Sequence, residues 1–107
     1  MKKQSKGIEQ YKERIKRSLA PVVAPEKVAD QDMLRGFIAL GLVEDNADNR
    51  ALTKSSRSKD WLARIAVCLH PNATEAQLSL LGNDSHSEVS VAASYALSKR
   101  DLKRDGP

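Results

Sequence analysis

The feature that most constrains this chain is a helical pattern that stops at Pro71. Upstream of it, four apolar residues spaced as i, i+3, i+4 and i+7 are Leu62, Ile65, Ala66 and Leu69. This spacing places them on one face of a helix that must be buried. Proline lacks the N–H that a continuing helix needs, so we predict that the helix ends near Leu69 and packs between other helices.

A second helical unit follows the break. Thr74 and Gln77 have the S/T-x-x-E/Q spacing of a capping box, which predicts a short helix directly after Thr74. Gly82 is expected to close that helix in the left-handed conformation. Ser85 and Glu88 repeat the capping spacing before a new apolar stripe. The stripe consists of Val89, Ala92, Ala93 and Ala96.

The pattern recurs earlier in the chain. When positions 72–74 are aligned with 46–48, the same shift pairs Leu78 with Leu52 and Val89 with Ala63. A stripe of the same kind lies before residue 46, at Leu34, Phe37, Ile38 and Gly41. A long helix, a turn and a short helix therefore recur as a unit, which is typical of stacked helical arrays.

The second unit resembles the variant leucine-rich repeat. The matching residues are Ala63, Arg64, Ala66 and Val67, the run 70–74, then Leu78, Leu81, Asp84 and Val89. The clear match covers residues 58–97, with weaker similarity over 32–57 and 24–28. The resemblance implies long and short helices stacked in a right-handed solenoid similar to HEAT repeats. Ser90 replaces Arg64 in the next copy, and the spacing of 26 differs from the family's usual 24. The iron–sulphur cluster of some members needs several cysteines, and this chain has one.

We therefore predict one all-α domain over residues 1–107: a short right-handed α-solenoid with a basic N-terminal capping helix. Residues 1–20 form the basic amphipathic helix, 21–97 the helical repeats and 98–107 a charged tail. Residues 55–58 are expected to be a loop. Pro25 is suited to the first position of a short helix, and Asp30 or Asp32 to the cap of the next.

Cysteine content, apolar runs and charge restrict the compartment of the protein and the kinds of site it holds. A single cysteine excludes an internal disulfide and an all-cysteine zinc site, which suits a reducing compartment. No run approaches 18 apolar residues. We expect a cytoplasmic protein that does not bind membranes. Its net charge of +4 is concentrated at one end, since residues 1–20 hold seven Lys or Arg against two Glu.

The basic N-terminal helix admits three interpretations. It caps the solenoid with a polar outer face, it binds nucleic-acid phosphates, or it lies on an anionic membrane. The capping role is favoured, because the helix lacks the interleaved aromatic residues that stack on bases. The residues for the nucleic-acid alternative are Lys12, Arg14, Lys16 and Arg17.

Three residues with reactive side chains have simple structural explanations. His70 belongs to the turn before Pro71, and His86 alternates with acidic residues that do not converge on one point as metal ligands must. Cys68 lies on an apolar helix, where a thiol behaves as a small hydrophobic group. No Gly-rich phosphate loop, paired-carboxylate motif or metal motif is present. We predict no catalytic residues, no metal and no cofactor.

We predict a non-enzymatic interaction module that binds a larger macromolecule, an adaptor or a regulator, through the solenoid surface. The candidate partner-binding residues are Arg35, Arg57, Lys59, Trp61 and Arg64. Trp61 and Arg64 also have a packing interpretation, as an inter-repeat contact and a structural ion pair. The alternative function is nucleic-acid binding through the basic helix and surface Arg and Lys. The identity of the protein partner and the oligomeric state, homodimer included, stay open.

Overall fold

The computed structural model describes residue 10 and residues 13–17, 19–21 and 23–104. Every regular element in these ranges is helical, which confirms the all-α class. Residues 13–17 are helical. The later elements are the 3₁₀ turn η1 (Pro25–Lys27) and the helices α2 (Asp30–Ala39), α3 (Asn49–Ser56), α4 (Trp61–Leu69), α5 (Glu75–Leu81) and α6 (Ser87–Arg104). None of the helices described is long and apolar enough to cross a membrane.

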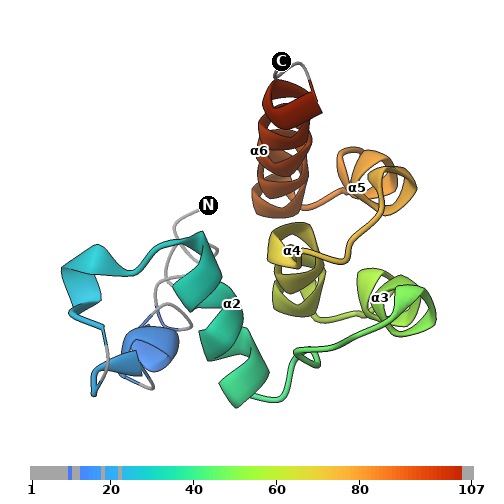
Figure 1. Cartoon of the computed structure of the whole chain (residues 1–107). Coiled ribbons are helices and arrows are strands. Elements are labelled where there is room, and N and C mark those ends of the chain that lie inside the picture. Colours follow the sequence, from blue (N-terminus) through green and yellow to red (C-terminus); the bar gives the residue numbers. More distant parts are fainter. Residues whose placement is uncertain (1–9, 11–12, 18, 22, 105–107) are drawn as a thin grey trace.

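The helices α2 to α6 lie in two rows (Figure 1). α4 packs between α2 and α6, and these three helices form one row. α3 and α5 contact each other and form the second row beside α4 and α6. Each connection passes from one row to the other, so α4 touches all four of the other helices. The most apolar helix of the sequence thus occupies the centre.

The ends of α4 are set by its neighbouring residues. The Asp60 carboxylate accepts a hydrogen bond from the Leu62 N–H at 3.0 Å, and so caps the first turn. The helix ends at Leu69, and His70 before Pro71 is extended, with φ −75° and ψ 132°. The predicted end of this helix is confirmed.

The start of α5 is also as predicted, but its end is different. Thr74 and Gln77 form the capping box: each backbone N–H donates to the other's side-chain oxygen, at 2.9 and 3.1 Å. Gly82, however, has φ −62°, so the expected left-handed closure is wrong. The chain leaves α5 through further right-handed turns, with the Asn83 N–H bonded to the Leu80 carbonyl. The positive φ in the described chain belongs instead to Gly41, at 77°, just after α2.

Other predicted boundaries also need correction. α6 begins at Ser87, so His86 and not Ser85 occupies the position before the helix, and its Nδ1 accepts the Glu88 N–H at 3.3 Å. α6 continues to Arg104, through most of the predicted tail, because Lys and Arg favour helices even where the apolar stripe fades.

The loop predicted over residues 55–58 begins later than expected. α3 extends to Ser56, whose hydroxyl donates to the Thr53 carbonyl at 2.7 Å, so this serine is satisfied inside the helix. The η1 turn is shorter than the predicted short helix. α2 takes Ala29 as its cap position, with the Asp32 carboxylate accepting the Ala29 N–H at 3.4 Å.

The shift found in the sequence reappears in the helix starts. α3 begins at residue 49 and α5 at 75, while α4 begins at 61 and α6 at 87. Core positions follow the same interval, since Leu52 and Leu78 are both fully buried and Ala63 and Val89 are both in the interior. The two copies therefore place equivalent residues at equivalent depths.

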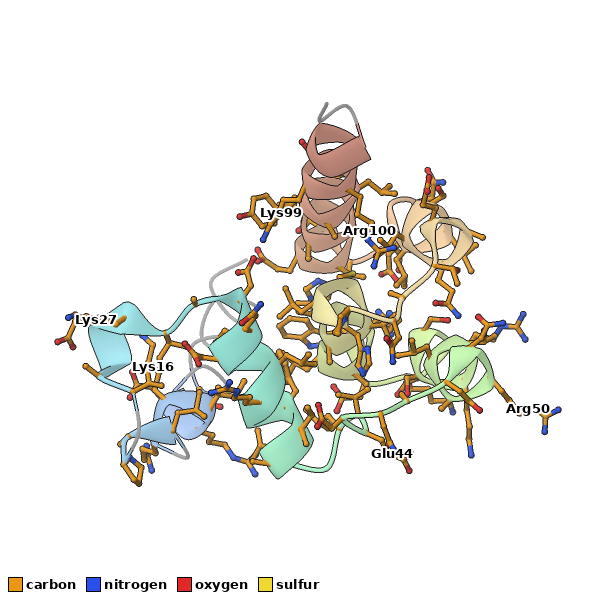
Figure 2. All side chains as sticks on the ribbon, in the orientation of Figure 1. Lys16, Lys27, Glu44, Arg50, Lys99 and Arg100 are labelled. Atoms are coloured by element: carbon orange, nitrogen blue, oxygen red, sulfur yellow. The ribbon has the colours of Figure 1, made fainter. Side chains whose placement is uncertain are left out.

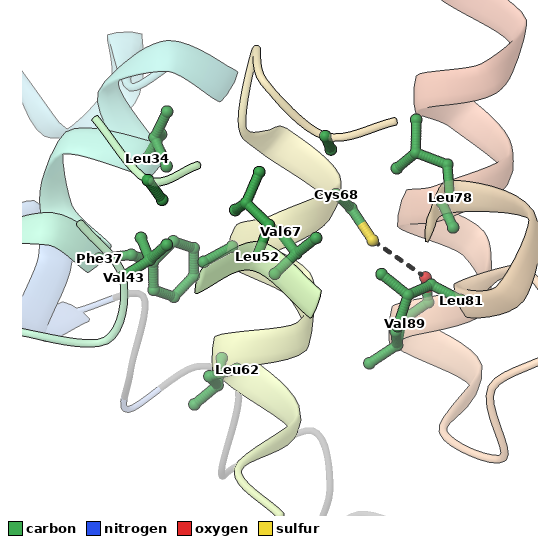
Figure 3. Packing of buried hydrophobic residues seen from close by; sticks show 14 of the residues in the cluster. Leu34, Phe37, Val43, Leu52, Leu62, Val67, Cys68, Leu78, Leu81 and Val89 are labelled. Atoms are coloured by element: carbon green, nitrogen blue, oxygen red, sulfur yellow. Dashed lines mark hydrogen bonds between the residues drawn. The ribbon is translucent and has the colours of Figure 1, made fainter. Parts of the chain in front are cut away.

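One contiguous hydrophobic core runs through both rows (Figure 3). The residues labelled there are Leu34, Phe37, Val43, Leu52, Leu62, Val67, Cys68, Leu78, Leu81 and Val89. The predicted α4 stripe is partly wrong, because Ile65 and Leu69 are only half-buried while Val67 and Cys68 are in the interior. A helix surrounded by four others buries more than one face.

Polar side chains also join the two copies. His70 is buried, and its Nδ1 accepts the Asn72 N–H at 3.1 Å, so Nε2 carries the proton and donates to the Glu44 carbonyl at 3.0 Å. The Asn72 amide donates to the Ala47 carbonyl at 3.1 Å. Gln77 of α5 also donates to Asn49 and Thr53 of α3. We call the contacts of His70, Asn72 and Gln77 the turn joint, because they fix the turn before α5 and the start of α5 against the turn before α3 and α3 itself.

Candidate interaction surfaces

A groove of about 350 Å³ opens between α2 and α6, over the C-terminal end of α4. α4 has nine residues and α6 eighteen, so α6 extends past the end of α4 (Figure 1). The floor is the segment from Cys68 to Pro71. The walls are Asp30, Gln31, Leu34, Arg35 and Ile38 from α2, with Tyr95, Ala96, Lys99 and Arg100 from α6, and Asp45 from the connection before α3 also lines the groove. We call this the α2–α6 groove.

Charged residues surround this groove. Lys99 lies on the side of α6 that faces α2 (Figure 2), and its Nζ is 3.5 Å from Oδ2 of Asp30. The same Nζ is 5.2 Å from the centroid of the Tyr95 ring. The Lys99 and Asp30 side chains are 53% and 45% exposed, so this ion pair contributes at most about 1 kcal/mol and is weakened by salt.

A second hollow, of about 1280 Å³, lies beside α3. Its apolar lining includes Ile38, Leu42, Val43, Ala47, Ala51 and Ala63. Its polar lining includes Glu44 and Asp45 from the connection before α3, and Arg50, Lys54 and Arg57 from α3 and its end. We call it the α3 hollow.

Arg50, Lys54 and Arg57 form a basic stripe along α3. Their spacing of i, i+4 and i+7 places them on one face of the helix, and all three are exposed. Figure 2 shows Arg50 pointing away from the molecule. Arg57 is among the predicted partner-binding residues, whereas Arg50 and Lys54 are not, although the helical spacing of the three is visible in the sequence.

The predicted partner-binding residues do not form one site. Arg35 is 67% exposed and lines the α2–α6 groove, with its Nη1 3.7 Å from Oδ1 of Asp32. Arg57 lines the α3 hollow. Lys59 is exposed in the connection between α3 and α4. These three residues are spread over two surfaces.

Trp61 and Arg64 make their contacts inside the molecule. The Trp61 ring stacks on the His86 imidazole, with centroids 4.1 Å apart and planes inclined by 12°. The Arg64 Nε donates to Oδ2 of Asp84 at 2.8 Å, and Nη1 donates to the Ser58 carbonyl at 2.6 Å. The contacts with His86 and Asp84 join α4 to the turn before α6, and the contact with Ser58 joins Arg64 to the segment before α4. These are the contacts that the packing interpretation of both residues expects.

Residues 13–17, which include three of the four residues of the nucleic-acid alternative, lie on the opposite side of the molecule from α3 (Figure 1). Lys12 is outside the described residues. Arg14 and Arg17 are exposed and Lys16 is half-buried, while Ile15 on the same segment is fully buried. Lys16 and Arg50 are on opposite sides of the view in Figure 2. The two groups of cations are therefore separate surfaces.

The candidate reactive side chains are held in structural positions. Burial, followed by the nearby Asp84 carboxylate, raises the pKa of the Cys68 thiol to about 12, so the thiol is protonated at neutral pH. Its Sγ lies 3.8 Å from the Val89 carbonyl of α6. His70 belongs to the turn joint, and His86 stacks on Trp61. Among the described residues, no three His, Cys, Asp or Glu side chains are grouped to hold a metal ion.

Comparison with protein-family models, with curated proteins and with solved structures finds no match for this chain. The surfaces of the chain are therefore the basis for its function.

Proposed function

We propose that this chain is a short right-handed α-solenoid of the variant leucine-rich or HEAT-like type, with a basic N-terminal helix as its cap. The two-row arrangement and the constant interval between equivalent helix starts support this assignment. Stacked repeats hold helices in a fixed relation and so create extended recognition surfaces. We propose that the chain is a non-enzymatic interaction module of the cytoplasm, and that its partner is a protein.

The α2–α6 groove is the observation that carries this proposal. Its walls are α-helices fixed by a continuous core, and its lining combines apolar side chains with charged ones at the margin. Protein interfaces share this organisation, with an apolar centre inside a polar rim. Tyr95 is 52% exposed on the groove wall and offers both a ring and a hydroxyl. Tyrosine is enriched among residues that dominate binding energy.

The proposal can be tested with a matched pair of substitutions on α6. Tyr95 lines the groove, whereas Val91, one turn earlier on the same helix and 66% exposed, does not. Wild-type protein, Tyr95→Ser and Val91→Ser are used as bait in nuclease-treated lysate of the source cells. We expect wild type and Val91→Ser to retain the same protein, and Tyr95→Ser to lose at least about tenfold in affinity.

Two outcomes would contradict protein binding. If capture disappears on nuclease treatment, the partner is held through nucleic acid. If no protein is retained by any of the baits, the module does not bind protein under these conditions. If Tyr95→Ser captures the same protein as strongly as wild type does, the α2–α6 groove is not the binding site.

Nucleic-acid binding is the second candidate, supported by the positive charge at the N-terminal end. It predicts that anisotropy of a labelled 20-base-pair duplex shows binding that falls steeply between 50 and 200 mM salt, because each phosphate contact releases counterions. Lys16→Glu with Arg17→Glu would abolish this binding. A duplex that does not bind at 50 mM salt removes the candidate.

A further inference from the structure

We propose that the α3 hollow is the docking site for an acidic amphipathic segment of the partner protein. This inference rests on the proposed function, since it names the chemistry of the segment that such a module would recognise. Three observations lead to it: the basic stripe on α3, the mixed lining of the hollow, and the spacing of the cations.

The cations of the basic stripe are not required by the fold. Arg50, Lys54 and Arg57 are exposed, and the ion pairs found among the described residues do not include them. Under the shift that relates the two copies, the equivalent positions at the next short helix are Ala76, Leu80 and Asn83. Both short helices, α3 with these cations and α5 without them, pack against α4. The fold therefore does not need the positive charges of α3, which are available for an external ligand.

The other lining residues favour a protein ligand over a polyanion. Glu44 and Asp45 face the same hollow, and their carboxylates would repel a continuous phosphate backbone. The apolar lining, for example Leu42 and Ala51, offers area for hydrophobic side chains. A segment with acidic residues toward α3 and apolar residues toward the floor satisfies both conditions.

The spacing of the cations suits a helical segment. Residues i, i+4 and i+7 are separated along the helix axis by about 6 Å and about 10.5 Å. Acidic residues with the same spacing on a second helix would lie opposite them, in the arrangement by which opposite charges stabilise neighbouring helical positions. Electrostatic complementarity of this kind gives specificity and a fast association rate.

The test uses a library of random 16-residue peptides displayed on phage, with wild-type protein as the target. Enriched peptides are synthesised with a fluorescein label and titrated by anisotropy. We expect Asp or Glu at intervals of three or four residues, together with Leu, Ile or Phe. Affinity should fall at least tenfold for the triple variant Arg50→Glu, Lys54→Glu, Arg57→Glu, and also for the milder triple change to Gln. A peptide with Lys in place of its acidic residues should regain affinity for the Glu variant.

The matched control reverses three cations elsewhere, at Lys16, Arg17 and Lys27, and should leave peptide affinity within about twofold of wild type. Circular dichroism and thermal melting confirm that each variant is folded.

Several results would overturn the inference. Enriched peptides without acidic residues would do so, and so would acidic peptides that bind the α3 variants as well as wild type. A 20-base-pair duplex that binds wild type and loses binding in the α3 variants would assign the hollow to nucleic acid. If peptides instead lose affinity with Tyr95→Ser, the inference fails while the proposed function stands. If neither peptide nor lysate protein binds, both fail.

Discussion

Gln77 joins two turns of the chain through opposite ends of its side-chain amide. Its Oε1 accepts the Thr74 N–H in the capping box, while its Nε2 donates toward the Asn49 carbonyl and Oδ1 and the Thr53 hydroxyl, at 3.2, 2.6 and 3.0 Å. The side chain is 7% exposed. One residue thus starts α5 and holds it against α3.

A change from Gln77 to Glu separates these two functions. The carboxylate still accepts the Thr74 N–H, but it places an acceptor where Nε2 now meets acceptors of Asn49. We expect a loss of about 2 kcal/mol in the free energy of unfolding at pH 7, measured by urea denaturation. The loss should shrink at pH 4, where a protonated carboxyl regains a donor. An unchanged urea midpoint at pH 7 would show that the contacts with α3 contribute little.

Cys68 makes stability depend on pH. Its pKa rises from 9.0 to about 12 on folding, so above pH 9 the unfolded thiol loses its proton while the folded thiol keeps it. Ionisation then favours the unfolded state, and stability falls as pH rises from about 9 toward 12. Between pH 8 and 10, wild type should lose about 1.4 kcal/mol more than Cys68→Ala. Parallel pH profiles for the two proteins in urea denaturation would contradict this.

Local contacts between residues were readable from the sequence, whereas distant ones were not. The capping box of Thr74 and Gln77 follows from a spacing of three residues. The bond from His70 to Glu44 links residues 26 positions apart, and a sequence pattern does not show which atoms such a pair will present. Serine favours the cap position, which makes Ser85 the predicted cap of α6, but His86 occupies that position instead.

At the scale of elements, Gly36 allows α2 to approach the N-terminal helical segment. A Cβ at this position would overlap Cγ2 of Ile15 and lie 2.9 Å from its Cβ. Both residues are buried. The close approach therefore depends on the absence of a side chain on α2.

Replacing Gly36 with Ala tests this packing. Helix propensity alone predicts a gain of about 1 kcal/mol, but the overlap with Ile15 should cost more, so we expect a net loss of about 1 to 3 kcal/mol. Adding Ile15→Ala should cost less in the Gly36→Ala background than in wild type, because it relieves the overlap. A double-mutant cycle from thermal or urea melts measures this coupling. Additive effects would mean that the two helices do not meet there.

Helix boundaries were predictable where a residue with a specific backbone effect marks them. Thr74 marks the start of α5 through its capping box, and Pro71 marks the end of α4. The end of α6 has no such residue, and its last turns carry charged side chains that are equally common in loops and tails. Likewise, the burial of Val67 depends on neighbours on several sides of α4, which a single apolar stripe does not reveal.

In the molecule as a whole, α4 connects every other helix of the two rows. Val67 of α4 is fully buried, and Val67→Ala removes about 2 kcal/mol of packing. Because the core is continuous, we expect exchange of the slowest amides in α2, α3 and α6 to accelerate together by about 30-fold, measured by hydrogen–deuterium exchange. Acceleration in α3 with α2 unchanged would show that the rows unfold separately.

The candidate surfaces were only partly predictable. The sequence predicts Arg35 and Arg57 as partner-binding residues, but their assignment to separate hollows depends on how α2, α3 and α6 are placed in space. Trp61 and Arg64 have the residue types of an interface, and their contacts with His86 and Asp84 became visible only once α4 and the turn before α6 were side by side. A residue type indicates what a side chain is able to bind, and the fold decides what it meets.

The contacts that α4 makes with the next unit are not repeated on α6. Trp61, Arg64 and Cys68 are the α4 residues that hold the following unit, and the equivalent positions on α6 carry Ser87, Ser90 and Ser94. The aromatic ring, the guanidinium and the thiol through which α4 contacts the next unit therefore have no counterpart at these positions of α6. Small hydroxyl side chains there offer a further helix neither the Trp61 stack nor the Arg64 ion pair, so α6 is unable to bind a neighbour in the way that α4 binds α6.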